Sequence, residues 1–165
     1  MLAIGILALG IFSRVVIHIP GFTPVIALAL FSGVYLKRSY AVIVPVLLMM
    51  VSDLFLGWHD TILYTWGSMA LISGLGIWLK NHKTPRSIIT LSAASSIIFF
   101  LITNFGAWLS LYPHTPEGLM TSYIAALPFF RNELLSTLIY GALLFWAYEL
   151  ITRRVKGTAL AGILM

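Results

Sequence analysis

Residues 88–111, IITLSAASSIIFFLITNFGAWLSL, decide the fold class of this chain. The stretch has no charged side chain and exceeds the roughly 20 apolar residues that a helix needs to cross about 30 Å of hydrocarbon. Of the 165 residues, 60% are hydrophobic and only 9% are charged, which is more apolar surface than a soluble core can bury. The apolar runs also lack the alternation of a membrane barrel. The sequence therefore predicts an all-α integral membrane protein.

The rest of the chain divides into further apolar segments of helical length. The second segment is short, because about 13 residues reach only about 20 Å. Residues 1–154 are therefore expected to form a single domain, one compact six-helix transmembrane bundle, followed by a short tail over 155–165. The six helices are expected at about 2–17, 24–36, 40–58, 62–79, 88–111 and 132–151.

The basic residues set the expected orientation of this bundle. They fall in three clusters that follow the second, fourth and sixth helices, so all three lie on one side of the membrane. Because basic loops face the cytoplasm, both termini are expected there too, in a multi-pass protein of the bacterial inner membrane. The clusters are Lys37 and Arg38; Lys80, Lys83 and Arg86; and Arg153, Arg154 and Lys156.

Several classes of function are disfavoured by what the sequence lacks. There is no cysteine, no HExxH, no GxSxG and no phosphate-binding glycine loop. His59 and His114 have no spacing typical of a metal site. The net charge of +5 sits in short loops and gives no nucleic-acid signature. We therefore expect no enzyme, no cofactor, no metal and no nucleic-acid partner.

One carboxylate is expected inside the membrane. Asp53 follows VLLMMVS, within the last turns of an apolar helix, where a lone charge costs several kcal/mol. Arg14 and Arg131 are the candidate partners, because an arginine can hold a carboxylate through two hydrogen bonds. The pair is either structural or leaves one arginine for a ligand, and both alternatives are open.

A second candidate group lies near the outer end of the fifth helix. Asn104, Trp108 and Tyr112 are four residues apart and share one helix face. An amide beside two aromatic rings is typical of a small-molecule pocket, although Trp and Tyr also gather at bilayer interfaces and an amide can join helices. The proline-rich residues 112–130 that follow are interpreted as an extracytoplasmic lid loop between helices five and six. An ordinary interfacial loop is the alternative.

Four segments together resemble one bacterial family of membrane transport proteins. The family is similar to the S components of energy-coupling-factor (ECF) vitamin transporters, and the resemblance extends to Arg154. The segments are Arg14 followed by GFTPVIALALFSG (21–33), Ser52 and Asp53 with Gly57, NFGAW (104–108) and YPHTPEGLMTSYIAALPFFRN (112–132).

This resemblance implies a substrate-binding subunit whose pocket lies near the outer face. It also implies two partners, a transmembrane coupling subunit and paired ATPases. The first helix differs from S components, because its small residues are out of register with their alanine-x-x-x-alanine docking stripe, whereas Ala29 and Gly33 have the spacing for close helix approach. The residues implied at the pocket or its lid are Arg14, Phe22, Asp53, Asn104, Trp108, Tyr112, Arg131 and Asn132.

The expected function is therefore uptake of a small molecule, such as a vitamin or a related ring-containing compound. The chain would bind it from the outer side of the bilayer. The alternative is a small structural or accessory subunit of a larger membrane complex. In that case the same outer polar residues would bind a protein partner.

Overall fold

The computed structural model describes residues 20–156, together with residues 5, 7, 8 and 12. The expected first helix and Arg14 lie outside these residues, as does the tail from residue 157. The described chain is helical and has no strand, and four of its helices are long and apolar enough to span a membrane. The fold is therefore all-α with multi-pass membrane character. The helices are α2 (Val25–Tyr35), α3 (Arg38–Leu56), α4 (Ile62–Leu79), α5 (Pro85–Leu111) and α6 (Pro116–Val155).

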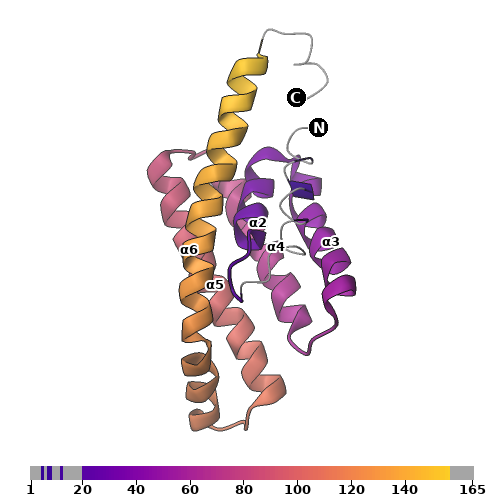
Figure 1. Ribbon diagram of the computed structural model, residues 1–165, viewed down its shortest axis with the longest axis vertical. Helices are drawn as coiled ribbons and strands as arrows, with labels where there is room; N and C mark the ends of the chain where they lie inside the picture. Colours follow the sequence, from indigo (N-terminus) through magenta and orange to yellow (C-terminus); the bar gives the residue numbers. More distant parts are fainter. Residues whose placement is uncertain (1–4, 6, 9–11, 13–19, 157–165) are drawn as a thin grey trace.

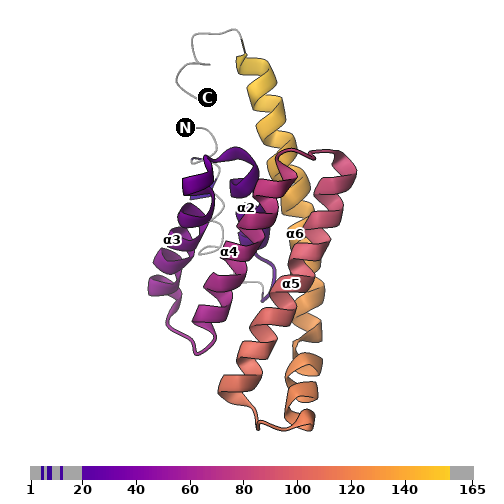
Figure 2. The ribbon, with the colours of Figure 1, turned by 180° about the vertical axis from the view of Figure 1, so that it is seen from behind.

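Helix α2 is the centre of the bundle. It contacts α3, α4, α5 and α6, and all its residues except Tyr35 are buried (Figures 1 and 2). Its 11 residues rise only about 16 Å, so it is too short to span the hydrocarbon alone. The expectation of a short second helix is confirmed. The long helices around it supply the apolar surroundings that the bilayer would otherwise provide.

The crossing of α2 and α4 depends on two glycines. A Cβ atom on Gly33 would lie 2.2 Å from the carbonyl oxygen of Ser73, and one on Gly76 would lie 2.3 Å from that of Leu30. Neither position can hold a side chain without moving a backbone. The expectation that Gly33 lies at a close helix approach is confirmed, and its partner is Gly76.

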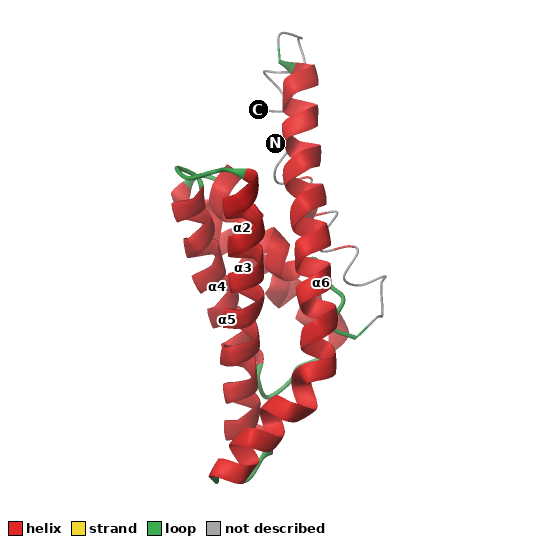
Figure 3. Cartoon of the chain, turned by 90° about the vertical axis from the view of Figure 1, so that its left-hand side faces the viewer, coloured by secondary structure: helices red, strands yellow, loops and turns green. Residues whose placement is uncertain are grey.

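Helix α6 differs most from the sequence-based expectation. Its 40 residues rise about 60 Å, twice the hydrocarbon thickness, and in Figure 3 it runs the length of the molecule. It begins at Pro116, after Thr115 caps it by accepting from the backbone N–H of Gly118. The predicted start near Asn132 is wrong, as is the extended lid loop, because only residues 112–115 connect α5 to α6.

The physical reason for the earlier start of α6 lies in its prolines. Pro116 occupies the first helical position, where its missing N–H costs nothing, so it starts the helix. Pro128 also lies inside α6. The helix is bent in Figure 3. A proline inside a helix removes one hydrogen bond and kinks the chain without ending it. The prolines interpreted as loop residues therefore begin a helix and bend it.

The other helix boundaries agree closely with the sequence. Helices α3 and α4 end within two residues of the expected positions. Helix α5 begins at Pro85, three residues before the expected position, and Thr84 caps it. The loops from α2 to α3 and from α4 to α5 lie at the same end of the bundle as the end of α6 (Figure 1). The three basic clusters therefore gather at one end, which we call the basic end.

Candidate functional site

A non-helical segment, residues 20–24, lies against the middle of α6. Asn132 donates its side-chain N–H to the carbonyl oxygen of Pro20 at 3.1 Å, and Ser136 donates its hydroxyl to that of Thr23 at 3.0 Å. Asn132 is about 24 Å along the axis from the start of α6, so these contacts are far from either helix end. Two α6 side chains thus satisfy carbonyl groups that a continuous helix would satisfy internally. Residues 20–23 lie between the expected ranges of the first two helices, and they are non-helical.

Close packing holds the same segment on α6. Gly21 has φ +74°, and a Cβ atom there would lie 2.6 Å from the carbonyl oxygen of Phe129. Only glycine satisfies both the backbone conformation and the close approach. The next residue, Phe22, sets its ring 5.8 Å from the ring of Tyr140. The segment therefore places an aromatic pair beside the polar contacts.

The carboxyl group of Glu133 is the main polar group at this junction. Its Oε1 atom is buried and has no hydrogen-bond partner among the described residues. Thr137 and Gly141 follow at intervals of four, so the three residues share one face of α6. Gly141 faces α5, since a Cβ atom there would lie 2.9 Å from the hydroxyl oxygen of Ser92. A polar stripe on α6 therefore runs up to α5.

Buried hydroxyl groups continue this polar region. The hydroxyl oxygens of Ser92, Ser95 and Ser96 on α5, like that of Thr137, have no partner in the described chain. Other hydroxyls of the bundle donate to their own helix; Ser73, for example, donates to the carbonyl of Met69. Most buried polar groups in proteins are hydrogen-bonded. The junction of α5 and α6 thus holds spare hydrogen-bonding capacity that a polar molecule could use.

The structure gathers only some of the residues predicted from the sequence. Phe22 and Asn132 meet at segment 20–24. Asp53 is buried on α3, where its Oδ2 accepts from the indole N–H of Trp66 at 2.9 Å. Arg131 is exposed on α6. The Asp53 carboxylate thus lies at the interface of α3 and α4, and nothing in the sequence pattern indicates Trp66 as a donor to it.

The three residues predicted to share one face of α5 make local contacts. Asn104 donates to the carbonyl oxygen of Phe100 on its own helix at 2.8 Å. Trp108 donates its indole N–H to the carbonyl oxygen of Pro113 at 2.9 Å and so closes the short connection to α6. Tyr112 is the C-cap residue of α5. The Trp108 donor thus stabilises the α5–α6 hairpin, and neither of these two hydrogen bonds involves segment 20–24.

Sequence reasoning missed the role of Glu133. With the sixth helix expected to begin at Asn132, Glu133 is not among the residues expected at the pocket. A pattern in the sequence could have identified Glu133. Glu133, Thr137 and Gly141 are four residues apart, so two polar residues and one small residue share a helix face within an apolar segment.

Comparison with known families gives one result. A family profile matches residues 1–160, nearly the whole chain. The chain belongs to DUF6580, a family of unknown function. A search of curated proteins and a search of solved structures each give no match. The function of this DUF6580 chain therefore has to be argued from its own residues.

Proposed function

We propose that this protein is the substrate-binding membrane subunit of a small-molecule uptake system, similar to an ECF S component. The observation that carries the proposal is the buried carboxylate oxygen of Glu133, which has no partner in the described chain. An ionisable group inside a membrane bundle is costly and marks a substrate or ion pathway more often than a structural contact. Its chemistry favours a ligand with hydrogen-bond donors.

The backbone around Glu133 supports the same proposal. Within a membrane, non-helical backbone is tolerated only where protein buries it or where it lines a cavity. Segment 20–24 is such a stretch, and interrupted helices are the usual ligand-binding elements of membrane transporters. Phe22 and Tyr140 would stack on a ring, and Asn132 would orient the molecule at the rim. A vitamin or a related ring-containing compound fits these groups.

The proposed arrangement in the bilayer follows the basic residues. With the basic end facing the cytoplasm of a bacterial inner membrane, a first helix over about 2–17 completes six spans and places both termini on the cytoplasmic side. The α5–α6 hairpin then faces outward, at the end from which substrate arrives. A transmembrane coupling subunit and ATPases would drive release inside.

Mass spectrometry of the purified protein tests this function. The protein is prepared gently from its native membrane as wild type, Glu133→Gln and Glu117→Gln, and denatured extracts are searched for small molecules. Glu117 is the matched control, because it is exposed in the first turn of the same helix. A hydrogen bond to a charged group contributes about 1.5–3 kcal/mol, so Glu133→Gln should reduce the co-purifying compound by at least about tenfold.

Two outcomes would reject the proposal. An equal amount of compound in Glu133→Gln and wild type would remove Glu133 from the site. A constant protein partner without any small molecule would favour an accessory subunit. Gel filtration of each variant establishes that a loss of compound does not reflect a loss of fold.

A further inference from the structure

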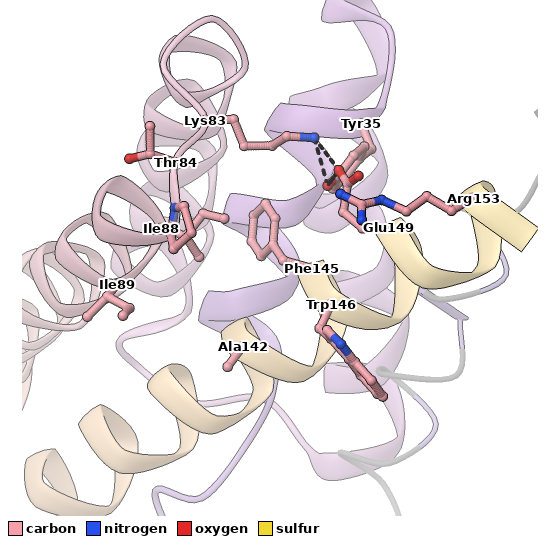
Figure 4. Close-up of a pocket in the computed structure, with 11 residues that line it drawn as sticks. Tyr35, Lys83, Thr84, Ile88, Ile89, Ala142, Phe145, Trp146, Glu149 and Arg153 are labelled. Atoms are coloured by element: carbon pink, nitrogen blue, oxygen red, sulfur yellow. Dashed lines mark hydrogen bonds and ion pairs between the residues drawn. The ribbon is translucent and has the colours of Figure 1, made fainter.

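A second site lies far from Glu133, at the basic end. It is a pocket of about 440 Å³ between the start of α5, the last turns of α6 and the end of α2 (Figure 4). Its deeper wall is apolar, with Phe145 at its centre. Its rim carries three charged side chains. The wall is formed by Ile88, Ile89, Ala142, Phe145 and Trp146, and the rim includes Lys83, Glu149 and Arg153.

The rim is held in place by a small network. Tyr35 donates its hydroxyl to Oε1 of Glu149 at 2.9 Å, and Lys83 forms an ion pair with the same oxygen. The ammonium of Lys83 also lies 4.9 Å from the centre of the Tyr35 ring. Lys83 and Arg153 approach Glu149 from opposite sides in Figure 4. One acid between two bases leaves a net positive rim.

Arg153 is a basic side chain of the rim whose hydrogen-bond donors are available to a ligand. It lies one turn beyond Glu149 and interacts with it electrostatically, yet it makes no hydrogen bond or ion pair within the described residues. Its five N–H donors are suited to a phosphate oxygen pair. Arg86, in the first turn of α5, and the positive end of that helix's dipole add to the positive potential of the same region.

The apolar wall indicates what the anion is attached to. Ile89 is 59% exposed and Trp146 is 64% exposed, so the pocket opens toward the surroundings of the bundle. In the membrane arrangement of the proposed function, those surroundings are acyl chains at the cytoplasmic interface, where tryptophan is common. A free anion would leave this wall uncovered, whereas an acyl chain would cover it.

We propose that this pocket binds an anionic phospholipid of the cytoplasmic leaflet. The headgroup phosphate lies against Arg153 and the Lys83 side of the rim, and one acyl chain covers Phe145 and Ile89. Basic pockets between membrane helices on the cytoplasmic side bind anionic headgroups in this way. The inference rests on the proposed orientation, but it does not depend on a ligand at Glu133.

Native mass spectrometry of the protein in nanodiscs tests the proposed phospholipid site. The nanodiscs contain equal amounts of phosphatidylglycerol and phosphatidylcholine, and the retained lipids are identified. The wild type should retain phosphatidylglycerol preferentially. Arg153→Gln should lower that preference at least about ten-fold, the factor expected for the loss of one hydrogen bond to a charged group. Arg154→Gln is the control, because it removes the same charge from the next residue, which does not line the pocket.

A second pair of variants tests the acyl chain without changing charge. Ala142→Trp fills the apolar wall and should abolish retention of phosphatidylglycerol. Leu143→Trp introduces the same side chain at an exposed neighbour outside the pocket and should leave retention unchanged.

Three results would overturn the proposal. Equal losses of the preference for phosphatidylglycerol in Arg153→Gln and Arg154→Gln would indicate that general surface charge attracts the lipid. Retention by Ala142→Trp together with displacement by inorganic phosphate would indicate a site for free anions. Absence of any preference in the wild type would remove the site altogether. Glu133→Gln should not affect lipid retention, so failure here is distinguishable from failure of the uptake proposal.

Discussion

Substitution of Gly33 by alanine should strongly destabilise the bundle. The added Cβ atom would lie 2.2 Å from the Ser73 carbonyl oxygen and 2.6 Å from two backbone atoms of Gly76. Ordinary contact begins near 3.4 Å, so α2 and α4 must separate by about 1.2 Å at their crossing. All three obstructing atoms are backbone, and no rotamer change can relieve the overlap. Overpacking costs typically 1–3 kcal/mol, and we expect Gly33→Ala at or above the upper value of roughly 3 kcal/mol.

The control for this prediction is Gly74→Ala on α4. A Cβ atom at Gly74 would meet nothing within 4 Å. Because alanine has a higher helix propensity than glycine, the control should be neutral or slightly stabilising. Unfolding of both variants and the wild type is followed by circular dichroism as SDS replaces a mild detergent. If Gly33→Ala unfolds at the same SDS fraction as Gly74→Ala, the backbone contact between α2 and α4 is not what the structure indicates.

Three further experiments test other contacts in the same unfolding assay. Trp66→Phe removes the donor to the Asp53 carboxylate and should cost about 1.5–3 kcal/mol; an unchanged midpoint would show that the bond contributes nothing. The Lys83–Glu149 ion pair is partly exposed, so a double-mutant cycle with Lys83→Met and Glu149→Gln should give a coupling of at most about 1 kcal/mol, and a much larger value would contradict solvent screening. Thr115→Ala removes the cap of α6 and should cost about 1 kcal/mol, measured as a lower midpoint; a rise would contradict the capping role.

Local signals in the sequence were sufficient for most helix boundaries. Thr84 and Pro85 mark the start of α5 because the threonine hydroxyl accepts a backbone N–H and the proline lacks one. The same reasoning applies to Thr115 and Pro116, which have the same dipeptide sequence, yet the prolines over residues 112–130 favoured a loop. Whether an internal proline ends a helix or bends it depends on tertiary packing, and local sequence carries little information about that packing.

The candidate site was less accessible to sequence reasoning. Polar residues at depth could be identified, as Asp53 was, but their partners come from other helices. The indole of Trp66 and the carbonyl of Pro20 are recognisable only when the helices are packed. Residue spacing reveals a shared face of one helix, as for Glu133 and Thr137, but not which helix that face meets. The positions of Phe22 and Asn132 were indicated only by family resemblance.

The last two glutamates of α6, Glu133 and Glu149, differ in their hydrogen-bond partners. Glu133 and Glu149 lie about 24 Å apart along the helix, at 1.5 Å per residue. At the basic end, Tyr35 and Lys83 satisfy the Glu149 carboxylate. In the interior, the buried Oε1 of Glu133 has no comparable donor in the described chain. Attachment of segment 20–24 to α6 does not require this carboxylate, because Asn132 and the hydroxyl of a neighbouring serine already provide it. A costly group whose carboxylate oxygen has no donor among the described residues therefore supports the proposal of a molecule that the protein binds and releases.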